Sequence, residues 1–261
     1  MIKYYSPMRE PVSSKNAWDE IYKKSQRRAQ SRPISIFAQN YEEEYLQVGE
    51  RFLTMLDVKK NEKILDAGCG SLGKIIIPAA KRNLNVTGID ISKTAIELLQ
   101  NKICKLKLEK NCKLYVGDIN SLPFEDGGFD KVFSTGTLLH LPFLDEYIAE
   151  LTRVTKKGGF LLLSYFKNKS SLINIFDRMM FKIEMVANAN SPGIYFHNFQ
   201  DIKEIFGRNN LKIMKTLSYH GFVPFYMLFR FPANFSRKYV FREIEHFDPS
   251  AHTWSFILRK S

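Results

Sequence analysis

The order of apolar and polar positions along the chain predicts strands that alternate with amphipathic helices. Apolar runs predict strands near 64–67, 85–89, 113–116, 160–164, 211–217 and 253–258, and a further strand follows the turn at 124–128. Apolar residues recur with helical spacing at 36–56, 92–108, 145–155 and 199–206. This alternation is typical of a doubly wound, Rossmann-like α/β sheet with helices on both faces.

Three segments lie outside this alternation. Residues 1–35 are polar and basic, with Trp18 and Tyr22 on one helical face, and they predict an N-terminal cap before a domain at 36–261. The stretches 167–198 and 220–247 should emerge where open α/β sheets bind ligands, so we expect them to cover a substrate. The aromatic residues between 222 and 235 fit either an apolar pocket or the core of a helical cover.

The stretch after the first strand has the composition of a ligand-binding turn. Gly68 and Gly70 permit backbone angles that other residues resist, and a helical pattern begins at Leu72. Bare backbone and the N–H groups of a helix start favour an electron-rich group. With Gly73, the spacing also matches a dinucleotide fingerprint, but Asp66 would repel a pyrophosphate and attract a cation. The turn therefore disfavours NAD.

A second carboxylate ends the next predicted strand. Asp90 lies about twenty residues beyond the glycines, where an acid accepts hydrogen bonds from both hydroxyls of a ribose. Ser92 follows as the expected cap of the next helix, whose Ile96, Leu99 and Ile103 should face inward.

Together these residues resemble the class I S-adenosylmethionine-dependent methyltransferases, in which an acid precedes a glycine turn of this kind. The run from Leu122 to Leu141 is similar to a recurrent family segment, although Leu139 stands where a histidine is common and Lys157 where proline is usual. The motifs cover about 64–165. The resemblance implies S-adenosylmethionine as cofactor, an antiparallel last strand, and binding of adenine by Asp118 and the adjacent apolar residue. The predicted cofactor-binding residues are Asp66, Gly68, Cys69, Gly70, Gly73, Asp90, Ile91, Asp118, Ile119 and Thr135.

Composition indicates one domain with additions. The chain has 261 residues, of which 44% are hydrophobic, enough for one full core. The first residues lack an apolar run, and nowhere do about eighteen uncharged apolar residues follow one another, so we expect a cytoplasmic protein without a transmembrane segment. Cys69, Cys104 and Cys112 form no close ligand pair, which favours reduced thiols and no metal site.

The net charge of +12 makes nucleic acid or an anionic membrane a candidate partner. Several of the lysines, however, fall on helix faces that should be solvated, as at Lys102 and Lys105. A charge spread in this way is typical of a solubility preference, so nucleic acid is the weaker alternative.

Methyl transfer from a sulfonium is an in-line displacement, so alignment of the two reactants should supply most of the catalysis. A histidine suits a general base near neutral pH, and His140, His197 and His220 are the candidates, ahead of Tyr165 and Tyr195. The prediction is methylation of an oxygen, nitrogen or carbon nucleophile on a small, partly hydrophobic molecule. Two alternatives stay open: a tRNA or other RNA methyltransferase, and a non-enzymatic S-adenosylmethionine-binding protein. The sequence does not indicate which oligomeric state the protein adopts.

Overall fold

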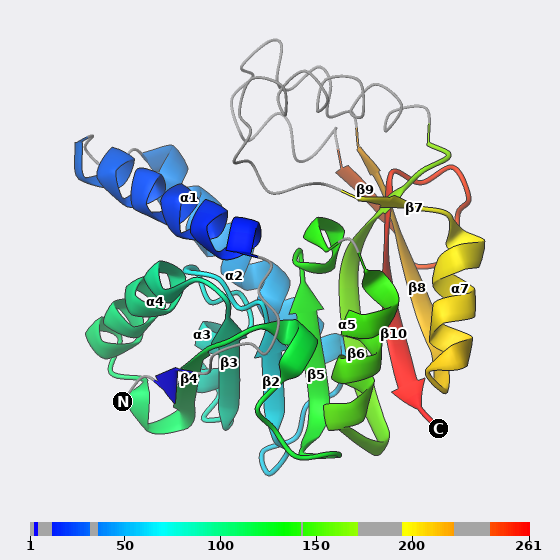
Figure 1. The fold of residues 1–261 in the computed structure, drawn as a ribbon. Coiled ribbons are helices and arrows are strands. Elements are labelled where there is room, and N and C mark those ends of the chain that lie inside the picture. Colours follow the sequence, from blue (N-terminus) through cyan, green and yellow to red (C-terminus); the bar gives the residue numbers. More distant parts are fainter. Residues whose placement is uncertain (1–2, 5–11, 32–35, 142, 172–194, 222–240) are drawn as a thin grey trace.

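The structure is a computed structural model that describes residues 3–4, 12–31, 36–141, 143–171, 195–221 and 241–261 (Figure 1). Within these ranges the strands form a single ten-stranded sheet. The elements in chain order are β1 (Lys3–Tyr4), α1 (Val12–Ser31), α2 (Ile36–Met55), β2 (Ile64–Ala67), α3 (Ile76–Lys81), β3 (Val86–Asp90), α4 (Lys93–Lys105), η1 (Glu109–Asn111), β4 (Cys112–Val116), η2 (Ile119–Ser121), β5 (Phe129–Thr135), η3 (Leu138–His140), α5 (Leu144–Val154), β6 (Thr155–Asn168), β7 (Phe196–His197), α7 (Phe199–Arg208), β8 (Leu211–Gly221), β9 (Phe241–Ile244) and β10 (Thr253–Lys260).

The sheet has the strand order β1-β4-β3-β2-β5-β6-β10-β8-β9, with β7 paired to β6. Strands β4, β3, β2, β5 and β6 are parallel to their neighbours, whereas β10 runs antiparallel to both β6 and β8. This arrangement confirms the predicted mostly parallel sheet with a reversed last strand. The carboxyl ends of its parallel strands meet at one edge, which is where open α/β sheets bind ligands.

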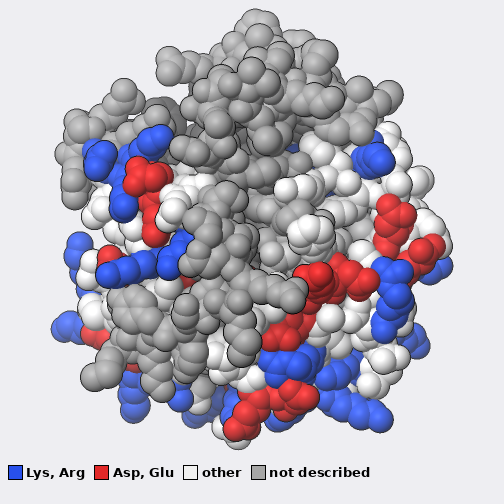
Figure 2. Space-filling view, in the orientation of Figure 1, with Lys and Arg blue, Asp and Glu red and all other residues white. Residues whose placement is uncertain are grey.

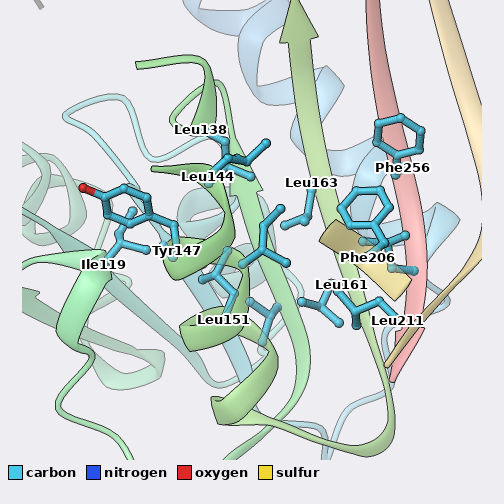
Figure 3. Close-up of a cluster of buried hydrophobic side chains, with 14 of the residues drawn as sticks. Ile119, Leu138, Leu144, Tyr147, Leu151, Leu161, Leu163, Phe206, Leu211 and Phe256 are labelled. Carbon is cyan, nitrogen blue, oxygen red and sulfur yellow. The ribbon is translucent and has the colours of Figure 1, made fainter. Parts of the chain in front are cut away.

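Two hydrophobic cores lie on opposite faces of the sheet. On one face α5 and α7 pack against strand residues such as Leu161 and Leu163, and Figure 3 shows Leu151 and Phe206 in this cluster. On the other face α2, α3 and α4 cover Ile64, among other strand residues. Each fully buried leucine or phenylalanine contributes about 1.5–3 kcal/mol, so the strands are held from both sides.

Helix α4 forms as its sequence predicts. The Ser92 hydroxyl accepts a hydrogen bond from the Ala95 N–H at 3.1 Å, which satisfies one of the open donors at the helix start. Ile96, Leu99 and Ile103 are all fully buried. Helix α3 is shorter than the pattern after the glycine turn suggested, and Pro78 lies in its first turn, where a missing N–H is tolerated.

Strand β6 differs from the prediction at both ends. It begins at Thr155, five residues before the predicted start at 160, and its first part includes Gly158, with a φ of +77°, and a register change in the pairing with β5. The strand also continues past 164 to Asn168. The short strands β1, β7 and β9 were not predicted. Strands β1 and β7 have two residues each, too few to show periodicity, and β9 falls in the stretch 220–247 that was expected to cover a substrate.

Residues 172–194 and 222–240 lie outside the described residues. They make up most of the two predicted cover stretches, 167–198 and 220–247. Within the described part of the chain, no helix combines the length and the apolar character needed to cross a membrane. The division into a cap at 1–35 and a domain at 36–261 stays a prediction.

Candidate functional site

The turn after β2 requires glycine at three positions. Gly68, Gly70 and Gly73 have φ angles of +78°, +59° and +62°, in the left-handed region that other residues rarely adopt. A Cβ on Gly68 would lie 2.2 Å from the Thr137 hydroxyl oxygen, and one on Gly73 would lie 2.5 Å from a methyl group of Leu99. The turn is therefore pressed against η3 on one side and α4 on the other.

Asp90 ties this turn to the start of α4. Its Oδ2 accepts a hydrogen bond from the Gly70 N–H, and its Oδ1 accepts one from the Ser92 N–H, both at 2.9 Å. The carboxylate is 8% exposed, and burial raises its pKa to about 6. Each oxygen retains a lone pair, so Asp90 can still accept hydrogen bonds from a ligand.

A cavity of about 130 Å³ opens above the turn at the carboxyl ends of the strands. Its walls come from α1, α2, the turns that follow β2 and β3, η2, β5, η3 and α5. The lining residues are Trp18, Tyr22, Tyr45, Gly68, Cys69, Gly70, Asp90, Ile91, Asp118, Ile119, Thr135, Gly136, Thr137, His140, Leu141 and Tyr147. We call this cavity the cleft.

The chemistry of the cleft fits a cofactor that has a cationic centre and no phosphate. Two carboxylates, Asp90 and Asp118, lie in its wall, and none of the described lining residues is a lysine or arginine. A pyrophosphate would meet these acids without a cation to pair with, whereas a sulfonium and an ammonium would be attracted. The bare backbone of Gly68 and Gly70 allows close approach.

Eight of the ten predicted cofactor-binding residues line the cleft, and Asp66 and Gly73 do not. Asp118 caps η2 by accepting a hydrogen bond from the Asn120 N–H at 3.0 Å, which leaves its second oxygen for a ligand. Burial raises the pKa of Asp118. Ile91 and Ile119, which follow these two acids, supply apolar walls beside them.

Asp66 lies beneath the turn, on the same face of the sheet as α2. It is fully buried, and neither carboxylate oxygen has a hydrogen-bond partner within the described residues. Burial raises its pKa to about 7, and the charge of Lys74 opposes this rise. Lys74 is itself buried, with its ammonium 4.3 Å from the ring centroid of Tyr45 and 4.8 Å from that of Tyr165.

A bulge in β6 places Tyr165 in this cluster. Between the pairs Leu163 with Phe256 and Phe166 with Trp254, two residues of β6 oppose one of β10. Tyr165 has a φ of +68°, a strained angle for a residue with a Cβ. The bulge reverses the alternation, so Phe166 packs into the α5 and α7 core while the Tyr165 ring turns to Lys74.

Only one of the three candidate histidines has its side chain placed in the cleft by the described residues. His140 packs edge-on against Trp18, with ring centroids 4.9 Å apart. His197 lies on β7 beside Phe166, where burial lowers its pKa, and its Nε2 has no hydrogen-bond partner in the described chain. The backbone of His220 belongs to β8, and its side chain lies outside the described part.

The sequence argument did not identify the aromatic wall of the cleft. Trp18 and Tyr22 come from α1 and Tyr45 from α2, and their spacing had indicated only helix faces. Tyr147 of α5 also lines the cleft, and Figure 3 shows its hydroxyl pointing away from the leucine core beside Ile119. A wall assembled from three helices leaves no local motif, although a tryptophan on a polar helix was the available signal.

Cofactor affinity should fall in acid because of Asp90. Its ionised carboxylate is the better acceptor, and its pKa of about 6 in the ligand-free protein means that protons compete with the ligand below that pH. We expect the dissociation constant of S-adenosylhomocysteine, measured by calorimetry, to be level above pH 7. Below pH 6 the dissociation constant should increase with each unit of acidification, approaching about tenfold per pH unit. Asp90→Asn should bind more weakly above pH 7 and lack this dependence.

The fold and the cleft define a cofactor-binding α/β domain with an acidic site. A family model described as a methyltransferase domain matches residues 58–216, more than half of the chain. The chain therefore belongs to this methyltransferase domain family. The match confirms the predicted class, the S-adenosylmethionine-dependent methyltransferases, and the predicted cofactor.

Curated relatives agree with this class. The chain is 34% identical over 116 residues to 24-methylenesterol C-methyltransferase 2 of Oryza sativa subsp. japonica, covering 44% of this chain and 32% of the relative. It is 32% identical over 104 residues to a sterol 4-C-methyltransferase of Caenorhabditis elegans, covering 40% and 31%. The match thus spans about a third of these relatives.

A solved structure with the same fold is the magnesium protoporphyrin IX methyltransferase of Synechocystis PCC 6803 with bound S-adenosylhomocysteine. Its TM-score is 0.65 at 18% identity, covering 97% of this chain and 100% of that chain.

Proposed function

We propose that this protein transfers a methyl group from S-adenosylmethionine to an oxygen, nitrogen or carbon nucleophile of a small, partly hydrophobic molecule. The observation that carries the proposal is the cleft, which joins a glycine turn to two carboxylates and has no lysine or arginine among its described lining. Such a wall suits a cationic methyl donor and disfavours a dinucleotide.

The aromatic side of the cleft supports an apolar acceptor. Trp18, Leu141 and Tyr147 are among its lining residues. Two matched relatives are named for sterols, which are apolar ring compounds. We include the stretches 167–198 and 220–247 in the proposal as acceptor cover. Cytoplasmic location likewise stays a prediction.

His140 is the residue we propose as general base where the acceptor requires one. Among the histidines with described side chains, it is the one that lines the cleft, and in η3 its backbone N–H donates a hydrogen bond to the Thr137 carbonyl at 2.9 Å. We expect His140→Gln to reduce turnover and leave the dissociation constant of S-adenosylhomocysteine unchanged. Equal turnover in the variant would exclude this role.

The test of the proposal combines binding with transfer. Calorimetry should show binding of S-adenosylmethionine and S-adenosylhomocysteine and no binding of NAD. Transfer of a labelled methyl group to cell extract, separated into lipid, small-molecule and RNA pools, should then label the lipid or small-molecule pool. Tight NAD binding without S-adenosylmethionine binding would overturn the proposal.

The RNA alternative draws on the net charge of +12. Among the described residues on the face shown in Figure 2, lysine and arginine are interspersed with aspartate and glutamate and form no continuous basic surface. Labelling of the RNA pool, with binding that weakens steeply with salt, would favour the alternative. Cofactor binding without transfer to any pool would favour a non-enzymatic protein.

A further inference from the structure

Helix α1 contacts the rim of the cleft with aromatic and acidic side chains. In Figure 1 it lies at the end of the sheet toward which β5 points. Trp18 and Tyr22 line the cleft, and the buried Tyr22 hydroxyl is hydrogen-bonded to the backbone of Ser71 in the glycine turn. A Cβ on Gly70 would lie 3.1 Å from that hydroxyl. A cofactor on this turn would therefore lie under α1.

Asp19 fastens α1 to the start of α4. Its Oδ1 accepts hydrogen bonds from the Ser92 hydroxyl and, at 3.1 Å, from the Thr94 N–H. The Ser92 N–H donates at the same time to Oδ1 of Asp90. Ser92 is thus hydrogen-bonded both to Asp19, which holds α1, and to Asp90, which faces the cleft.

The titratable side chains that interact electrostatically with Asp90 are all acids within the described residues. They are Asp19 and Tyr22 from α1, and Asp66 and Cys69 from β2 and the turn after it. The charge of Asp19 raises the pKa of Asp90, which means that the two carboxylates repel each other when α1 is in place. Hydroxyl donors and a cationic centre brought by a ligand would offset this repulsion.

We propose that Asp19 is a positioning residue that couples the docking of α1 over the cleft to cofactor binding at Asp90. The inference rests on the proposed function, since it takes the cofactor to bind in the cleft. Coupling is reciprocal: a cofactor that favours docked α1 binds more tightly when α1 docks readily. Asp19 itself need not touch the cofactor.

Asp19→Ala tests the coupling, with Glu20→Gln as the matched control. Glu20 is the adjacent acid on α1, and its carboxylate pairs with Lys23 on the exposed side. In the unmodified protein, S-adenosylhomocysteine should slow hydrogen exchange of the α1 amides. Asp19→Ala should exchange faster without ligand and bind S-adenosylhomocysteine about tenfold more weakly, while Glu20→Gln should match the unmodified protein in both measurements.

Asp19→Asn separates coupling from a merely structural role. It keeps an acceptor oxygen and removes the charge, so the pH below which S-adenosylhomocysteine affinity falls should move downward; Glu20→Gln should leave it in place. Unchanged affinity in Asp19→Ala, or an unmoved pH profile in Asp19→Asn, would overturn the coupling even though the cofactor still binds. Failure of the unmodified protein to bind S-adenosylhomocysteine would overturn the proposed function and the coupling together.

Discussion

Replacing Gly49 with alanine is expected to lower the free energy of unfolding by about 3 kcal/mol, because the new methyl group has no room. A Cβ on Gly49 would lie 1.7 Å from the carbonyl oxygen of Lys74 and 2.7 Å from its carbonyl carbon. These are backbone atoms at the end of the glycine turn, so no rotamer change relieves the clash and α2 must shift. Phe52 and Leu53, which α2 buries almost completely, would shift with it.

Urea unfolding followed by circular dichroism measures this loss, and Gly207→Ala is the matched control. Gly207 also lies in a helix, α7, but its added Cβ would meet nothing within 4 Å. Alanine is the better helix former, so this variant should gain about 0.5–1 kcal/mol. Equal midpoints for Gly49→Ala and the unmodified protein would contradict the close packing of α2 on the turn.

The sequence predicted the elements that carry a full period of pattern. Helix α2 begins and ends within one residue of the predicted range 36–56, and the predicted inward face of α4 is buried. Strong periodicity over several turns or alternations leaves one satisfactory way to bury the apolar side chains. The order of elements then fixed the doubly wound class, because parallel strands need helical crossovers.

Features that depend on contacts between distant segments were not predictable in this way. Gly49 interrupts no pattern within α2, and its need for glycine arises only where Lys74 crosses it. The bulge at Tyr165 depends on the register of β10, a strand almost ninety residues later in the chain. Lys74 had no local signal either, because a lysine beside a helix start is ordinarily solvated.

The same distinction, between local pattern and contacts of distant segments, separates the site residues that were predicted from those that were not. Gly68, Asp90 and Asp118 were predicted because each follows a strand, and the carboxyl ends of parallel strands converge at one edge. Asp66 was expected to face the ligand, but strand alternation turns its side chain to the buried side shared with Ile64 and away from the cleft. When Asp66 is ionised, its charge can still favour a cation nearby, since the low dielectric around it screens little.

Asp90→Ala is expected to weaken S-adenosylhomocysteine binding by at least about a hundredfold, and Asp118→Ala by about tenfold. We expect Asp90 to accept two hydrogen bonds from the ribose and Asp118 one from the adenine. Each bond to a charged group is worth about 1.5–3 kcal/mol, and 1.4 kcal/mol is a factor of ten. Asp90 also orders the glycine turn, because its loss frees the N–H groups of Gly70 and Ser92, whereas Asp118 accepts hydrogen bonds from the backbone of η2, outside that turn.

Calorimetry on both variants measures this difference, and Asp130→Ala is the control for removal of an acid from a strand. Asp130 lies near the start of β5, where it bonds the Lys63 N–H and pairs with Lys156, at the edge of the sheet away from the cleft. Its variant should bind S-adenosylhomocysteine as the unmodified protein does. Equal losses at Asp90 and Asp118 would show that the ribose contact is assigned to the wrong strand end. A loss at Asp130 as large as that at Asp90 would show instead that overall stability, and not a contact in the cleft, controls binding.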